Sequence, residues 1–190
     1  MKGAHVAMMD FDKILGVFRE DTNRAFLRLM GDRGTVFWVP WSLRDERIAA
    51  LCEATIRSGK LSARQDDAMV EIVFGDRSAR AELADEPGDR HRTLLALNLA
   101  LAPDFEARFL WDSTGSDSGA FLTLTPDQWR EIEALAGASF AHRVLSITPE
   151  LNIFTQLTPR MRPPAPQRAT PKDSAGPDPS QRRPWWRFWG

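Results

Sequence analysis

One polar loop in this 190-residue chain carries residue types that can do chemistry. It runs from Asp112 to Gly119 and reads Asp-Ser-Thr-Gly-Ser-Asp-Ser-Gly. Carboxylates and hydroxyls gathered in one loop are the groups that acid–base catalysis and metal binding use. We therefore take Asp112 and Asp117, together with His142 further along the chain, as the candidate catalytic residues. An acid–base or metal site would require the three side chains to meet.

Known motifs fit this loop only in part. Asp117-Ser118-Gly119 is the tripeptide of aspartic proteases, but Gly115 and Ser116 precede it where those enzymes need apolar residues. The spacing from Gly115 to Gly119 is that of a nucleophile elbow, yet aspartate stands where serine must be. A calcium loop would place oxygen ligands at every second residue and end in glutamate. The simpler interpretation is a hairpin loop, since Asp, Ser and Gly are favoured there.

His142 lies in a predicted strand over residues 140–147. Strand parity places it on the same side as Phe140 and Val144, which is the apolar face. A lone histidine in such a place is more often a core residue than a base or a ligand. A functional role would require the fold to bring it within hydrogen-bond reach of Asp112 or Asp117.

The remaining signatures of enzymes and metal sites are missing from the sequence. The single cysteine, Cys52, excludes an intramolecular disulfide and a cysteine zinc cage, and it lies on the apolar stripe of a predicted helix. Glycine-rich phosphate loops and paired metal-ligand spacings do not occur. We therefore expect a protein that is not an enzyme, with no cofactor and no metal.

Apolar periodicity predicts the elements that must position these residues. Helices are expected over 10–31, 42–59, 93–101 and 125–137, and strands over 35–39, 69–74, 79–83, 105–111, 120–124 and 140–147; residues 151–157 fit either type. Asp10, Ser42 with Asp45, and Thr125 with Gln128 are the expected helix caps. The fold class is therefore α+β, a single domain. It has a mostly antiparallel sheet of about six strands, three to four helices packed on that sheet, and a disordered C-terminal tail.

Composition divides the chain into four segments. Residues 1–8 are expected to be a flexible N-terminus and residues 9–158 the α+β domain. Residues 159–183 form a proline-rich disordered linker, since eight prolines fall within 159–190 and periodic apolar positions are lacking before Trp185. Residues 184–190, Pro-Trp-Trp-Arg-Phe-Trp-Gly, form a C-terminal hook.

The net charge of −1 is the sum of two segments that carry opposite net charges. Up to Thr158 the chain has 18 basic and 24 acidic residues, whereas residues 159–190 have seven basic residues against Asp173 and Asp178. The net charge is thus −6 for the domain and +5 for the tail. Because phosphate contacts need a basic face, the acidic domain is not expected to bind nucleic acid.

The hook is the strongest binding candidate in the chain. Three of the seven tryptophans fall in the last six residues, and exposed large aromatic side chains favour association. Tryptophan and arginine dominate protein interfaces and also suit the membrane–water boundary. In composition the segment is similar to short cationic Trp/Arg membrane-active peptides, which implies affinity for an anionic surface. The binding residues are expected to be Arg182, Arg183, Trp185, Trp186, Arg187, Phe188 and Trp189.

Several functions follow from these features. The leading hypothesis is a non-enzymatic adaptor or immunity-type binder that uses the acidic domain for one protein partner and the hook for another. The alternative is a peripheral protein tethered to an anionic membrane through the tail, and the hook docking on its own domain is a further option. A third class is a hydrolase or metal-dependent enzyme centred on Asp112, Asp117 and His142. Without an export signal or a spanning segment, the expected location is the cytoplasm, with the inner membrane face as an alternative.

Overall fold

The structure, a computed structural model, describes residues 4–40, 42–86, 88–114 and 116–157. Within these ranges the helices are α1 (Ala4–Glu20), α2 (Asn23–Gly31), α3 (Glu46–Ile56), α4 (Asp89–Leu101), α5 (Pro126–Ala136) and α6 (Phe140–Arg143). The strands are β1 (Val36–Pro40), β2 (Leu61–Gln65), β3 (Met69–Phe74), β4 (Arg77–Glu82), β5 (Glu106–Leu110), β6 (Ser118–Leu124) and β7 (Val144–Ser146). Short helical turns are η1 (Trp111–Ser113), η2 (Gly137–Ser139) and η3 (Ile153–Leu157). The predicted α+β class is confirmed.

The strands pair antiparallel, as predicted, but they form two sheets where one was expected. One sheet has the order β1-β6-β5-β7 and the other the order β2-β3-β4. The unpredicted strand β2 explains the second sheet, because it pairs with β3 from Leu61 to Gln65 beside the predicted β3–β4 hairpin. Its sequence, Leu-Ser-Ala-Arg-Gln, lacks the β-branched and aromatic residues that indicate a strand.

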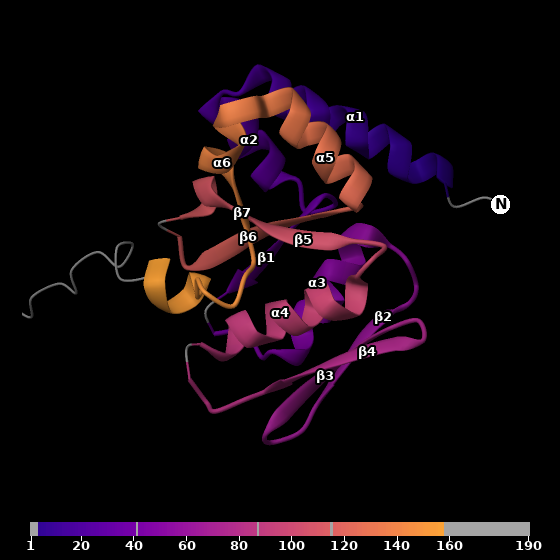
Figure 1. Cartoon of the computed structure of the whole chain (residues 1–190), viewed down its shortest axis with the longest axis vertical. Helices are drawn as coiled ribbons and strands as arrows, with labels where there is room; N and C mark the ends of the chain where they lie inside the picture. Colours follow the sequence, from indigo (N-terminus) through magenta and orange to yellow (C-terminus); the bar gives the residue numbers. More distant parts are fainter. Residues whose placement is uncertain (1–3, 41, 87, 115, 158–190) are drawn as a thin grey trace, which may run out of the picture.

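Helices and sheets alternate in layers (Figure 1). Helices α1, α2 and α5 cover one face of the four-stranded sheet, and α3 and α4 lie between its other face and the three-stranded sheet. Successive side chains of a strand point to opposite faces, so Phe109 and Leu110 of β5 enter different cores. The four-stranded sheet is therefore buried on both faces.

Two hydrophobic clusters result from this layering. The inter-sheet core joins α3 and α4 to both sheets, and its largest fully buried residues are Ile48, Ile72, Leu94, Leu97, Leu101, Phe121 and Phe154. The helical-face core lies under α1, α2 and α5, and its largest are Phe26, Leu29, Leu110, Leu122 and Trp129. Helix α4, predicted to be central because it is apolar nearly all round, is confirmed to lie between the sheets, beside α3.

The predicted helix over residues 10–31 is two helices. Helix α1 ends at Glu20, Asp21 has a positive φ of 44°, and the Oγ1 atom of Thr22 accepts a hydrogen bond from the amide of Ala25 at 3.1 Å. Thr22 is therefore a helix N-cap that restarts the chain in a new direction. The break lets the rings of Phe18 and Phe26 meet edge to face at 5.1 Å.

The two predicted capping boxes have different outcomes. At α5 the box is present, with the Gln128 amide donating to Thr125 Oγ1 at 3.2 Å and the Thr125 amide donating to Gln128 Oε1 at 3.0 Å. At α3 the predicted Ser42–Asp45 box is wrong. Asp45 precedes the helix without a capping bond, because its Oδ1 atom accepts the hydroxyl of Thr93 at 2.9 Å instead.

Candidate functional site

His142 lies on a short helix and not on the predicted strand. Residues Phe140–Arg143 form α6, and β7 begins only at Val144. The helical turn is held because the ring of Phe140 packs 6.1 Å from that of Trp129 and 6.2 Å from that of Phe18. Strand parity consequently does not apply, and His142 is exposed to solvent, so the prediction that it faces the core is wrong.

Arg143, the residue after His142, is the side chain that reaches Asp112. Its Nη1 atom donates to Asp112 Oδ1 at 2.7 Å and to Asn23 Oδ1 at 2.9 Å, and its Nε atom donates to Asp21 Oδ1 at 3.2 Å. The guanidinium carbon also lies 4.5 Å from the centre of the Phe26 ring. Arg143 thus ties α6 to the α1–α2 junction and to the turn that follows β5.

The structure does not bring the three predicted catalytic candidates together. Asp112 is partly buried against Arg143, while Asp117 and His142 are exposed. Among the described residues, no hydrogen bond joins His142 to Asp112 or to Asp117. The shape of the loop comes from buried Ser113, whose hydroxyl donates to the Leu110 carbonyl at 2.7 Å and accepts the Ala120 amide at 3.0 Å. The loop connects antiparallel neighbours β5 and β6, as a hairpin loop does.

Removing the Arg143 guanidinium should destabilise the fold. The Oδ2 atom of Asp112 is already buried without a hydrogen-bond partner, so Arg143→Met would leave the whole carboxylate without its ion pair. We expect the free energy of unfolding to fall by about 2 kcal/mol, the usual cost of losing hydrogen bonds to a charged group. Urea denaturation followed by circular dichroism measures it. Asp112→Asn keeps an acceptor for Arg143 and should cost less, so a larger loss for Asp112→Asn would contradict this account.

A second polar cluster, which sequence analysis missed, lies at the start of α4. Asp45, Asp89, His91 and Thr93 are all buried there, and we call them the α4 polar cluster. Asp89 Oδ2 accepts the amides of Ala84 and Glu86 at 2.9 and 3.0 Å, and its Oδ1 accepts Arg92 Nη1 at 2.7 Å. His91 Nε2 lies 2.9 Å from the carbonyl oxygen of Thr148. The acidic residue in the first turn of the helix was the only sequence signal for this cluster.

Burial shifts the pKa values of two members of the α4 polar cluster. It raises the pKa of the Asp45 carboxyl above its usual value, with the hydroxyl of Thr93 acting in the opposite direction. It lowers the pKa of His91, because the charged imidazolium is disfavoured away from water, while the bond to Thr148 acts in the opposite direction. In both side chains burial therefore favours the uncharged form.

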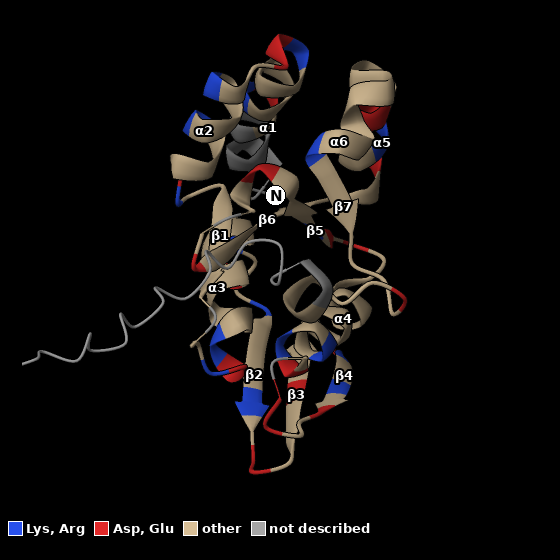
Figure 2. Cartoon of the chain, turned by 90° about the vertical axis from the view of Figure 1, so that its left-hand side faces the viewer, with Lys and Arg blue, Asp and Glu red and all other residues tan. Residues whose placement is uncertain are grey.

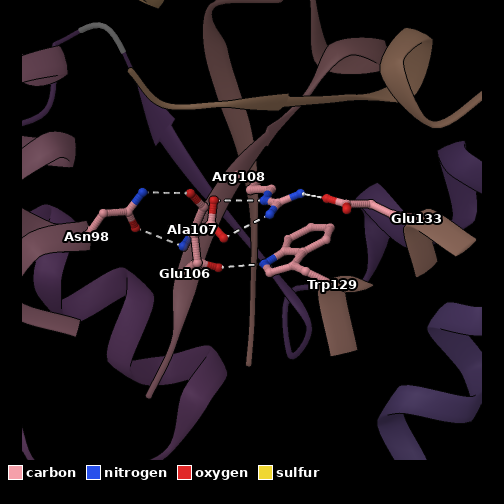
Figure 3. Close-up of polar contacts among 6 residues, drawn as sticks. All are labelled: Asn98, Glu106, Ala107, Arg108, Trp129 and Glu133. Atoms are coloured by element: carbon pink, nitrogen blue, oxygen red, sulfur yellow. Dashed lines mark hydrogen bonds and ion pairs between the residues drawn. The ribbon is translucent and has the colours of Figure 1, made fainter. Parts of the chain in front are cut away.

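A third set of polar contacts fastens β5 to the helices on both sides of its sheet (Figure 3). The side-chain amide of Asn98 donates to the Ala107 carbonyl at 2.9 Å and accepts a hydrogen bond from the Ala107 amide at 2.8 Å. Ala107 lies just before the part of β5 that pairs with β7. Arg108 donates to both oxygens of Glu106 at 2.8 and 2.9 Å and also pairs with Glu133. Its guanidinium stacks over the ring of Trp129. The carboxylates of Glu106 and Glu133 are therefore both paired with Arg108.

Cys52 is fully buried, as predicted, and burial raises the pKa of its thiol to about 12. Its sulfur lies 3.5 Å from the hydroxyl of Thr123, and that hydrogen bond only partly offsets the effect of burial, so the thiol stays protonated. Over the described ranges, no three His, Cys, Asp or Glu side chains are grouped closely enough to hold a metal ion. Nor does any helix in those ranges have the length and apolar character needed to cross a membrane.

The residues of the hook, from Arg182 to Trp189, lie outside the described residues. In the described part of the chain, acidic residues gather near one end of the three-stranded sheet (Figure 2). Asp66 and Asp67 occupy the turn between β2 and β3, and Asp85 and Glu86 follow β4. The Leu83 amide donates to the Ala68 carbonyl at 2.8 Å, which places these two acidic turns side by side.

These features define an α+β protein in which a pair of helices is held between two antiparallel sheets. Comparisons with protein-family models, curated proteins and solved structures find no match for this chain.

Proposed function

We propose that this protein is a non-enzymatic protein-interaction module, an adaptor or immunity-type binder that docks through its C-terminal hook and its acidic domain. The observation that carries the proposal is the hook itself: three tryptophans in the last six residues, on a tail of net charge +5 that follows a domain of −6. Tryptophan and arginine supply large contact areas with a polar group at the edge, and they dominate the binding energy of protein interfaces.

The described end of the domain supports this proposal by fixing the start of the tail. Ile153 and Phe154 are buried in the inter-sheet core, and the Phe154 ring stacks 6.5 Å from the ring of Phe121. The tail therefore follows, within a few residues, a segment that is anchored in the core. A tether with a fixed origin keeps its binding segment at a high local concentration near the domain surface, which favours simultaneous binding of one partner by both parts.

The acidic turns of the three-stranded sheet supply the second part of the proposed interface. Asp67, Glu82 and Asp85 are exposed and form no ion pair within the described part of the chain. Their free charges suit a partner with a basic surface, because opposite charges raise the rate of encounter and favour the correct partner. The proposal gives no catalytic role to Asp112, Asp117 or His142, and the third hypothesis, a hydrolase, depends on those residues alone.

The test compares the full chain with a chain stopped at Ser180. Both are used to capture partners from cells, and each captured protein is then purified and its affinity measured by titration. We expect the shortened chain, and a full chain carrying Trp→Ala at 185, 186 and 189, to bind at least about 30-fold more weakly, as the loss of roughly 2 kcal/mol from a hot spot implies. The matched control, Pro177→Ala with Pro179→Ala, changes the linker alone and should bind like the full chain. Equal affinity of all four proteins would refute the proposal.

The alternative, a peripheral membrane protein tethered by the tail, is favoured by the same pairing of tryptophan with arginine. Indoles prefer the headgroup level of a bilayer and arginines meet anionic lipid there. Sedimentation of the full chain with vesicles of anionic lipid, and with neutral vesicles as the control, separates this function from protein binding. Binding to anionic vesicles that is lost in the chain stopped at Ser180 would favour the membrane function.

A further inference from the structure

The last described segment of the domain is a strap that crosses the inter-sheet core after β7. We define this strap as residues 147–155. Three of its side chains, Ile147, Ile153 and Phe154, are buried in that core. The Oδ1 atom of Asn152 shapes it by accepting the amides of Phe154 and Thr155 at 3.0 and 3.1 Å. Burial of these apolar side chains holds the strap in place, and it pairs with no strand among the described residues.

The strap rests against the first turn of α4. A Cβ atom at Gly88 would lie 3.1 Å from the side-chain nitrogen of Asn152, which shows how closely the two segments approach. A polar contact between them is the bond from His91 to Thr148. The Thr148 carbonyl can only accept, so Nε2 of His91 carries the proton and donates at 2.9 Å. The other ring nitrogen, Nδ1, is then the unprotonated one.

His91 Nδ1 is buried and has no hydrogen-bond partner, and the whole residue is only 3% exposed. The neutral ring suits this place, because an unprotonated nitrogen loses little by facing apolar atoms. Protonation would add a donor and a full positive charge where no acceptor is in reach. Burial of an unpaired charge is costly enough that a protein rearranges or releases the proton instead.

We propose that His91 is a pH-sensitive latch: protonation of its imidazole releases the strap from the inter-sheet core and frees the origin of the C-terminal tail. The released strap exposes His91 to water, where the charge is solvated. The latch concerns the strap alone and does not depend on what the tail binds.

Within the described ranges, none of the charged groups on the segments that adjoin His91 forms a hydrogen bond or ion pair with its ring, whose Nδ1 atom has no partner. They come from α4, the start of α3, the β4–α4 connection and the strap itself: Asp89, Arg90, Arg92, Arg44, Asp45, Glu46, Asp85, Glu86 and Glu150. Asp89 holds Arg92 and two backbone amides, and Asp45 accepts the Thr93 hydroxyl. Arg90 donates to the Leu43 carbonyl at 2.7 Å, and its guanidinium has no acceptor to offer the ring.

The direction of the pH effect follows from burial, which lowers the pKa of His91 in the docked state. The released state has the ordinary value of about 6.5 and so binds the proton more tightly. Docking is therefore strongest above about pH 6.5 and weakens as the pH falls toward the lowered pKa of the docked state. Over that window the docking equilibrium constant falls by up to about tenfold for each pH unit, the limit for one proton.

Methyl NMR of the full chain tests the latch. The Ile153 and Ile147 methyl groups report strap docking, Ile14 and Ile132 in the helical-face core report the rest of the fold, and the ring signals of His91 give its pKa. On acidification from pH 7.5 to 5 we expect the two strap methyls to move toward random-coil positions along the His91 titration, while Ile14 and Ile132 stay.

The matched variant is His91→Gln, whose side-chain NH₂ can donate to the Thr148 carbonyl but does not titrate. Its strap methyls should remain docked across the same pH range. Three outcomes would overturn the latch: strap methyls that do not move while His91 titrates, an unchanged pH response in His91→Gln, or movement of Ile14 and Ile132 together with the strap.

Discussion

Replacing Phe121 by alanine is expected to lower the free energy of unfolding by about 3–5 kcal/mol, the range for a large buried aromatic side chain. Phe121 is fully buried in the middle of β6. Its ring lies 5.3 Å from that of Phe37 on β1, 5.5 Å from that of Phe109 on β5, and 6.5 Å from that of Phe154 on the strap. One side chain therefore links three strands to the strap, and its removal leaves a cavity that each of them lines.

Urea denaturation followed by circular dichroism measures this loss. Phe121→Leu retains most of the volume and should lose clearly less stability than the alanine variant. Leu27→Ala serves as a surface control, because Leu27 on α2 is 65% exposed and truncation there should change stability by no more than about 0.5 kcal/mol. A loss below about 1 kcal/mol for Phe121→Ala would show that the ring does not occupy a close-packed position.

Local signals made part of this fold predictable. The start of α5 has a hydroxyl, a proline and a glutamine in the order that a capping box needs, and the β3–β4 hairpin has Gly75-Asp76 between alternating residues. Helix α4 is apolar on nearly every side, which fits a helix between two sheets. In each case the deciding interactions lie within a few residues of one another.

The remaining elements depend on contacts between distant segments. Residues 140–143 have the alternation of a strand, but contacts of the Phe140 ring with Trp129 and Phe18 hold them as a helical turn. The short strand β2 is stabilised by α3, where Glu53 Oε2 accepts the Leu61 amide at 3.1 Å. Neither partner can be inferred from the residues inside the element.

The polar clusters were harder to predict than the fold for the same reason. Asp112 was a candidate because of its loop. Its partner, Arg143, lies 31 residues away on α6, a helix in a segment for which a strand was predicted. His91 stands among charged residues at the start of a helix and looks like a surface residue. It is buried, and its ring bonds to Thr148 of the strap, 57 residues further along the chain. Residue type indicated the chemistry, and tertiary packing decided which groups met.

Trp129→Ala is the second substitution with a large expected effect, again about 3–5 kcal/mol. Trp129 is fully buried on α5, and its Nε1 atom donates to the Glu106 carbonyl at 2.9 Å. Its ring also lies 4.7 Å from the guanidinium carbon of Arg108 and 6.1 Å from the Phe140 ring that holds α6. Truncation would therefore open a cavity, leave a carbonyl without its donor and remove the aromatic face that covers a half-buried cation.

Trp129→Phe separates these contributions. Phenylalanine keeps an aromatic face for Arg108 and much of the volume but cannot donate to the Glu106 carbonyl, so its loss should be about 1–3 kcal/mol, the cost of an unsatisfied buried acceptor. Arg108→Met combined with each tryptophan variant then measures the cation–π coupling, expected at about 0.5–2 kcal/mol for a partly buried pair. Coupling is expected with Trp129→Ala, where the ring is lost, and should be much smaller with Trp129→Phe. Equal coupling for both variants would mean that Arg108 is held by Glu106 and Glu133 alone, and that the indole contributes only its volume and its hydrogen bond.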